Sequence, residues 1–123
     1  MKIKFYPIPE TDGAIKCTIH KNGKLGFSKG AEKLLGIDES KYIQIGRNVE
    51  DSQDSNLYVT VSTEKVEDSL KVNKAGKYYY LNTKTLFDSL NYQYDTQKII
   101  YDISEVNVGS EKYFKLKRRI KKR

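Results

Sequence analysis

The chain has 123 residues, of which 37% are hydrophobic and 32% charged, with ten tyrosines and a formal net charge of +7. This length fits one small domain and excludes a large multidomain enzyme. One cysteine and one histidine exclude an internal disulfide and a four-ligand zinc site built from these residue types. No apolar run reaches the roughly 18 residues of a membrane helix, and the first residues lack the apolar region of a signal peptide. We therefore expect a cytoplasmic protein with no membrane contact.

Alternation of apolar and polar residues predicts a mostly β fold. We expect strands over residues 3–8, 15–19, 24–27, 42–45, 57–61, 70–73, 77–81, 98–103 and 113–117. Two segments, 29–35 and 83–90, instead predict short helices. The first lies between Ser28, a good N-cap, and Gly36, a good C-cap. The expected fold class is α+β, mostly β with two short helices.

The net positive charge is concentrated at the end of the sequence. Residues 115–123 hold seven of the 23 basic residues and no acidic one, which leaves the rest of the chain with equal numbers of both. We expect a single domain over 1–114 and a basic tail over 115–123, which is either attracted to phosphate or simply solvated. The candidate phosphate contacts of this tail are Lys115, Lys117, Arg118, Arg119, Lys121, Lys122 and Arg123.

The two expected helices lie in similar surroundings, which indicates an internal repeat. The sequence 21–24 reads Lys-Asn-Gly-Lys, and 74–77 reads Lys-Ala-Gly-Lys. A glycine in each tight turn permits positive φ. We expect copies over about 14–62 and 69–114, each made of two strands, a helix and two strands, and preceded by an N-terminal strand over 1–9.

From His20 to Ile45 the first copy runs through a strand, a glycine turn, a strand, a helix ending in Leu35-Gly36-Ile37, and a strand. This order is similar to the AbrB/MazE/SpoVT swapped-hairpin family. The resemblance implies an intrachain swapped-hairpin β-barrel of two β-β-α-β-β repeats, as in tandem MraZ-like proteins. Members of that family mostly bind DNA, as transition-state regulators or as antitoxins. Carried over to this chain, the candidate phosphate contacts in the hairpins are Lys21, Lys24, Lys29, Lys74, Lys77 and Lys84.

We therefore expect a non-enzymatic protein that binds nucleic acid, with duplex DNA as the ligand, without a cofactor, as a monomer or homodimer. Two alternatives stay open. One is a protein-interaction or antitoxin-like module with no sequence-specific DNA binding. The other is a single-strand binder in which exposed tyrosines stack on bases.

The strand pattern also makes predictions for individual side chains. It places Tyr42, Tyr58 and Tyr79 on the outer faces of their strands, and Tyr78 and Tyr80 on the opposite face of theirs. Cys17 shares parity with Ile15 and Ile19, which favours a buried small apolar residue over a nucleophile. His20 is interpreted as a hairpin residue and not as a catalytic base.

Overall fold

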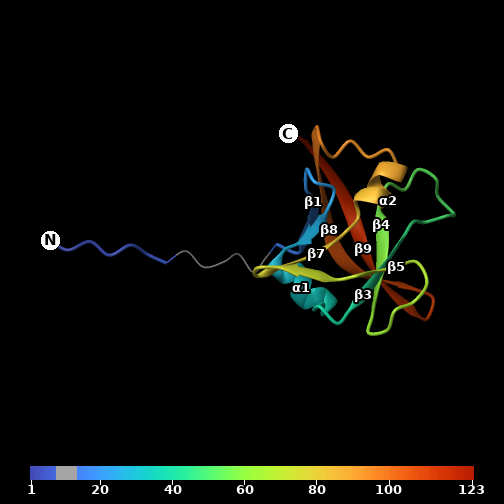
Figure 1. The fold of residues 1–123 in the computed structure, drawn as a ribbon, viewed down its shortest axis with the longest axis horizontal. Helices are drawn as coiled ribbons and strands as arrows, with labels where there is room; N and C mark the ends of the chain where they lie inside the picture. Colours follow the sequence, from blue (N-terminus) through green and yellow to red (C-terminus); the bar gives the residue numbers. More distant parts are fainter. Residues whose placement is uncertain (8–13) are drawn as a thin grey trace.

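The structure, a computed structural model, describes residues 1–7 and 14–123. Its nine described strands form one nearly closed, barrel-like antiparallel sheet with two short helices (Figure 1). In chain order the elements are β1 (Lys16–Ile19), β2 (Leu25–Phe27), α1 (Lys29–Leu35), β3 (Tyr42–Gly46), β4 (Leu57–Ser62), β5 (Ser69–Lys71), β6 (Asn73–Ala75), β7 (Tyr78–Leu81), α2 (Lys84–Ser89), β8 (Gln97–Val108) and β9 (Glu111–Lys122). The strands lie in the order β5-β3-β4-β9-β8-β1-β2-β7-β6, so the two edge strands follow each other in the chain.

Alternate residues of the strands fill the inside of the sheet. Cys17 and Ile19 of β1, Leu25 of β2, and Ile99 and Tyr101 of β8 are at most 1% exposed and belong to one apolar cluster. Because side chains of a strand point alternately to its two faces, the residues between them lie on the outer face. The expectation that Cys17 is buried is confirmed.

Helix α1 begins and ends where the sequence predicts. The Ser28 hydroxyl oxygen accepts a hydrogen bond from the Ala31 N–H, and Gly36 ends the helix in the left-handed region at φ 64°. The second expected helix is also present, as the shorter α2, and its N-cap Thr83 makes no side-chain capping bond. Within the described parts of the chain, no helix is long and apolar enough to cross a membrane.

The last two strands, β8 and β9, are longer than the sequence predicts. β8 and β9 are each twelve residues long and pair along their whole length, from Gln97 opposite Lys122 to Val108 opposite Glu111. The expected strands 98–103 and 113–117 are shorter because the buried apolar residues that mark them, Ile99, Tyr101 and Ile103 in β8 and Phe114 and Leu116 in β9, occupy only part of each strand. The boundary expected at residue 114 is therefore wrong, because residues 115–122 continue strand β9 and are no separate tail.

The expected N-terminal strand over 1–9 is not found in residues 1–7, which form no strand and are exposed throughout. Residues 8 and 9 lie outside the described residues. The alternation of Lys2, Ile3, Lys4 and Phe5 resembles a strand, but a strand needs a hydrogen-bonded partner, and none of the described strands pairs with this segment.

The element order strand, strand, helix, strand, strand occurs twice, from β1 to β4 and from β6 to β9. β2 pairs with β7 and β4 pairs with β9, so corresponding strands of the two halves meet. The correspondence is incomplete, because β1 pairs with β8 whereas β3 pairs with the additional strand β5. The repeat and the swapped hairpin stay predictions.

Ser28 provides a test of how α1 is fixed to the sheet. Its hydroxyl oxygen also accepts a hydrogen bond from the Lys16 N–H at 3.1 Å, and the hydroxyl donates to the Ala14 carbonyl at 2.6 Å. We predict that Ser28→Ala lowers the free energy of unfolding by about 1–2 kcal/mol, because a cap and two further bonds are lost. Urea unfolding measures this. Ser52→Ala, in the exposed loop before β4, is the control and should change stability by less than about 0.5 kcal/mol; equal losses would contradict the prediction.

Candidate nucleic-acid interface

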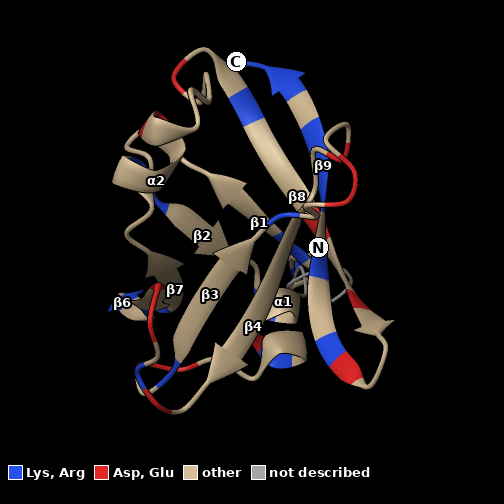
Figure 2. Cartoon of the chain, turned by 90° about the vertical axis from the view of Figure 1, so that its right-hand side faces the viewer, with Lys and Arg blue, Asp and Glu red and all other residues tan. Residues whose placement is uncertain are grey.

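Pairing in β9 sorts the basic residues of the C-terminal region onto two faces. Phe114 and Leu116 point into the core, so Lys115, Lys117, Arg119 and Lys121 share the outer face. Figure 2 shows basic segments in blue along β9 towards its C-terminal end. Four of the seven predicted tail contacts are thus brought together by the pairing of strand β9.

Neighbouring strands add two cations to this surface. Lys98 of β8 lies opposite Lys121 of β9 in the strand register. Asp102 of β8 lies opposite Lys117 of β9 on one side and Lys16 of β1 on the other. We call the resulting surface the outer basic face, and it consists of Lys16, Lys98, Lys115, Lys117, Arg119 and Lys121. Lys16 and Lys98 are not among the contacts predicted from the sequence, although the parity of their strands, opposite to Cys17 and Ile99, places them on the outer face.

The Asp102 carboxylate lies within the outer basic face. Asp102 accepts hydrogen bonds from Arg119 Nε at 2.6 Å and from the Arg119 terminal nitrogen at 3.1 Å. Among the described residues, no ion pair involves Lys98, Lys117 or Lys121. Lys98, Lys117 and Lys121 therefore keep their charge available, whereas Arg119 is neutralised by Asp102.

Two of the predicted tail arginines have structural contacts instead. The Arg118 guanidinium lies 5.1 Å from the centre of the Tyr92 ring. Arg123 donates hydrogen bonds to the carbonyl oxygens of Tyr94, at 2.7 Å, and Ile19, at 2.8 Å. These bonds fasten the end of the chain to β1 and to the loop after α2. Lys122 is exposed and shares the parity of Arg118.

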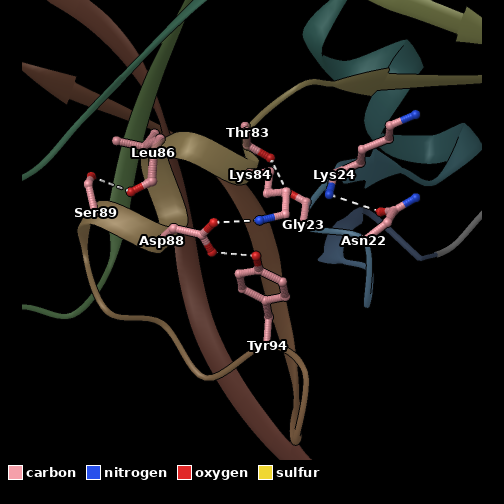
Figure 3. Close-up of polar contacts among 9 residues, drawn as sticks. All are labelled: Asn22, Gly23, Lys24, Thr83, Lys84, Leu86, Asp88, Ser89 and Tyr94. Atoms are coloured by element: carbon pink, nitrogen blue, oxygen red, sulfur yellow. Dashed lines mark hydrogen bonds and ion pairs between the residues drawn. The ribbon is translucent and has the colours of Figure 1, made fainter.

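The six lysines carried over from the family resemblance have unequal surroundings. Lys84 donates to Asp88 at 2.7 Å, and Asp88 also accepts a hydrogen bond from the Tyr94 hydroxyl (Figure 3). The bond to Asp88 raises the pKa of Lys84 above its ordinary value. Lys29, the first residue of α1, pairs with Glu32 at 3.3 Å. The others, Lys21, Lys24, Lys74 and Lys77, are at least partly exposed.

The turn between β1 and β2, which carries Lys21, is held in place by α2. Thr83, fully buried at the start of α2, donates a hydrogen bond from its hydroxyl to the Gly23 carbonyl at 2.8 Å (Figure 3). Gly23 has φ +83°, and a Cβ there would lie 2.8 Å from Cβ of Lys84. The contact requires glycine at this position and fixes the β1–β2 turn, with Asn22 and Lys24, against the second half of the chain.

The expected faces of the tyrosines in β7 are wrong. Leu81 is fully buried and Tyr79 packs against the core, so both point inward. Tyr78, 59% exposed, and Tyr80 therefore lie on the outer face. The three consecutive tyrosines have equal apolar character and do not define the parity of the strand, which buried Leu81 sets.

The residues weighed as catalytic candidates have clear environments. Burial raises the pKa of the Cys17 thiol well above its ordinary value, which keeps it protonated. His20 lies over Gly26, with Nε2 2.5 Å from the point where a Cβ of residue 26 would stand. In the described residues no group of three His, Cys, Asp or Glu side chains is placed to hold a metal ion.

No protein-family model matches this chain, and comparisons with curated proteins and with solved structures found no match either.

The pKa of His20 depends on burial and on the nearby charges of Arg123 and Lys98. Partial burial, followed by the cations Arg123 and Lys98, lowers the pKa of His20 from its ordinary value near 6.5. Since the unfolded chain binds the proton first, this histidine reduces stability as the pH falls through about 6.5. We predict that Arg123→Gln raises the pKa of His20, measured as the pH titration of the only imidazole signal in the NMR spectrum.

Arg47→Gln is the matched control for this titration. Arg47 is exposed in the segment after β3, and its removal changes the net charge by the same amount. The pKa of His20 should stay at the wild-type value in this variant. If both variants shift it equally, overall charge and not the position of Arg123 sets the pKa.

Proposed function

We propose that this protein binds nucleic acid without catalysing a reaction, and that the outer basic face contacts the phosphates. The observation that carries the proposal is the pairing of β9 with β8, which aligns Lys115, Lys117 and Lys121 on one face beside Lys98. A row of lysines that keep their charges fits a polyanion, because each bound phosphate releases condensed counterions. Duplex DNA remains the ligand expected from the sequence, and regulation of the AbrB type or an antitoxin-like role stays a prediction.

The chemistry of the outer basic face favours binding without sequence readout. Lysine is a point charge that positions a phosphate, whereas specific contacts to guanine use the fork of arginine. The one arginine of this face, Arg119, is already bonded to Asp102 through two nitrogens. With its five other cations each contacting one phosphate, the slope of log K against log salt would approach about −4.5 on duplex DNA.

The proposal is tested by removing two of these lysines. We predict that the double variant Lys117→Gln, Lys121→Gln makes the salt slope on a labelled duplex shallower by about 2, because two counterions fewer are released. The affinity should fall by up to about 60-fold near 0.1 M salt, the limit of the same relation. Fluorescence anisotropy over a salt series measures both quantities.

The matched control is the double variant Lys65→Gln, Lys71→Gln. These exposed lysines lie on β5 and in the segment before it, and their replacement changes the net charge equally. The control should keep the wild-type slope. An equal change in both variants would mean that only overall charge matters, and the absence of binding to any oligonucleotide would show that the proposed function is wrong.

A further inference from the structure

A groove with a volume of about 470 Å³ lies on the outer side of β1, β2 and β7. This volume is in the range of ligand sites in proteins. Thr18 of β1, Gly26 of β2 and Tyr80 of β7 are adjacent in register, and all three line it. Because Leu25 and Phe27 are buried, residue 26 faces outward. Glycine at this position makes room for the His20 imidazole, which lies over it and lines the groove beside Tyr80.

Aromatic rings and cations meet in this groove. Lys24 Nζ lies 4.6 Å from the centre of the Tyr80 ring, and Lys29 Nζ lies 5.0 Å from the centre of the Tyr78 ring. The described lining contains Lys16, His20 and Lys24 and no acidic residue, and Lys29 lies beside it. Exposed aromatic rings with ammonium groups beside them are the combination that binds stacked bases and their phosphates in single-strand sites.

The strand that carries the rings is held in place by α1. Glu32, only 8% exposed, accepts a hydrogen bond from the Tyr79 N–H at 3.2 Å and pairs with Lys29 at 3.3 Å. Lys29 also donates to the Lys77 carbonyl. These contacts fix β7 on both sides of Tyr78, so a ligand would meet rings that are already positioned, which lowers the entropy cost of binding.

The groove is continuous with the outer basic face. Lys16 belongs to both, since it lines the groove and is paired in register with Asp102 of β8. In the next register row, Arg119, Ile100 and Thr18 follow one another across β9, β8 and β1. A polyanion that lies on the lysines of β9 and β8 would therefore reach the rings of β7 by extending across β1 and β2.

We propose that this groove binds unpaired bases of a single-stranded nucleic acid whose phosphates lie on the outer basic face. This inference rests on the proposed function and specifies its ligand. A base in a duplex is already paired and stacked, so it cannot reach Tyr78 or Tyr80 without being unpaired. Single strands should consequently bind more tightly than duplexes of equal length, through a contribution that salt does not remove.

The test compares a labelled oligothymidine of about 12 nucleotides, within the site sizes known for single-strand grooves, with a duplex of equal length. The full chain and its variants are measured by fluorescence anisotropy at low and high salt. We expect Tyr80→Leu to weaken single-strand binding by about 5- to 150-fold, the equivalent of losing one stacked base. Tyr80→Phe keeps the ring and should stay within about twofold of wild type, because stacking needs only the aromatic face.

Tyr42→Leu is the matched control. Tyr42 is also a partly buried tyrosine on the outer face of a strand, β3, but it does not line the groove. Tyr42→Leu should leave the affinities for the single strand and for the duplex unchanged, whereas Tyr80→Leu should leave only the affinity for the duplex unchanged. Thermal unfolding verifies that each variant folds. If Tyr80→Leu does not fold, the pair Tyr78→Leu and Tyr78→Phe provides the same comparison at a position that is 59% exposed.

The failure of this inference is distinguishable from the failure of the proposed function. If Tyr80→Leu and Tyr80→Phe bind the single strand equally well while the Lys117, Lys121 double variant still loses affinity, the groove is no base site but the outer basic face stands. If polyglutamate displaces the single strand from wild type and Tyr80→Leu with equal efficiency, the groove inference is also overturned, because charge alone explains binding. If neither oligonucleotide binds, both proposals are wrong.

Discussion

The pairing of β8 with β9 along twelve residues is the constraint on which the rest of the molecule depends. A strand cannot direct neighbouring side chains to the same face, so pairing divides the basic run after Phe114 between two environments. Lys115, Lys117 and Lys121 lie on the outside, whereas Arg118 lies against Tyr92. The same hairpin joins the two halves of the sheet, since β9 pairs with β4 and β8 pairs with β1. One interaction therefore both holds the barrel-like sheet together and arranges its charge.

Most of the fold could be predicted, because short strands with a buried face carry a period-two pattern and α1 has clear capping residues. The predictions fail where burial does not set the pattern. Residues 104–108 and 118–122 extend β8 and β9 by backbone pairing, with few apolar residues to mark them. The segment 1–7 shows the opposite case, since Ile3 and Phe5 alternate with lysines but are exposed. A strand requires a partner, and sequence periodicity does not contain that information.

The sequence predicts most of the basic residues of the candidate site, but it does not predict how they are arranged. The sequence predicts the basic run after Phe114 from its charge. In a tail all of these cations would have the same surroundings, whereas in a strand each side chain points either to a partner or to solvent. Arg119 bonds to Asp102 and Arg123 bonds to backbone carbonyls, and neither partner is close in sequence. Lys16 and Lys98 join the outer basic face only because β1 and β8 pair in the observed register. Long-range register is the information that a single sequence does not provide.

In the two proposals, the outer basic face and the groove of β7 would contribute different kinds of binding energy along one direction. Register places Arg119 and Tyr80 four strands apart, which at about 4.8 Å per strand is about 19 Å along the sheet. A strand of nucleic acid lying across β9, β8, β1 and β2 would meet exposed lysines first and aromatic rings last. Attraction to the lysines acts at a distance and weakens with salt, whereas stacking on a ring needs contact and depends little on salt. The arrangement that we propose would capture any polyanion at one end and would select at the other end for those that have free bases.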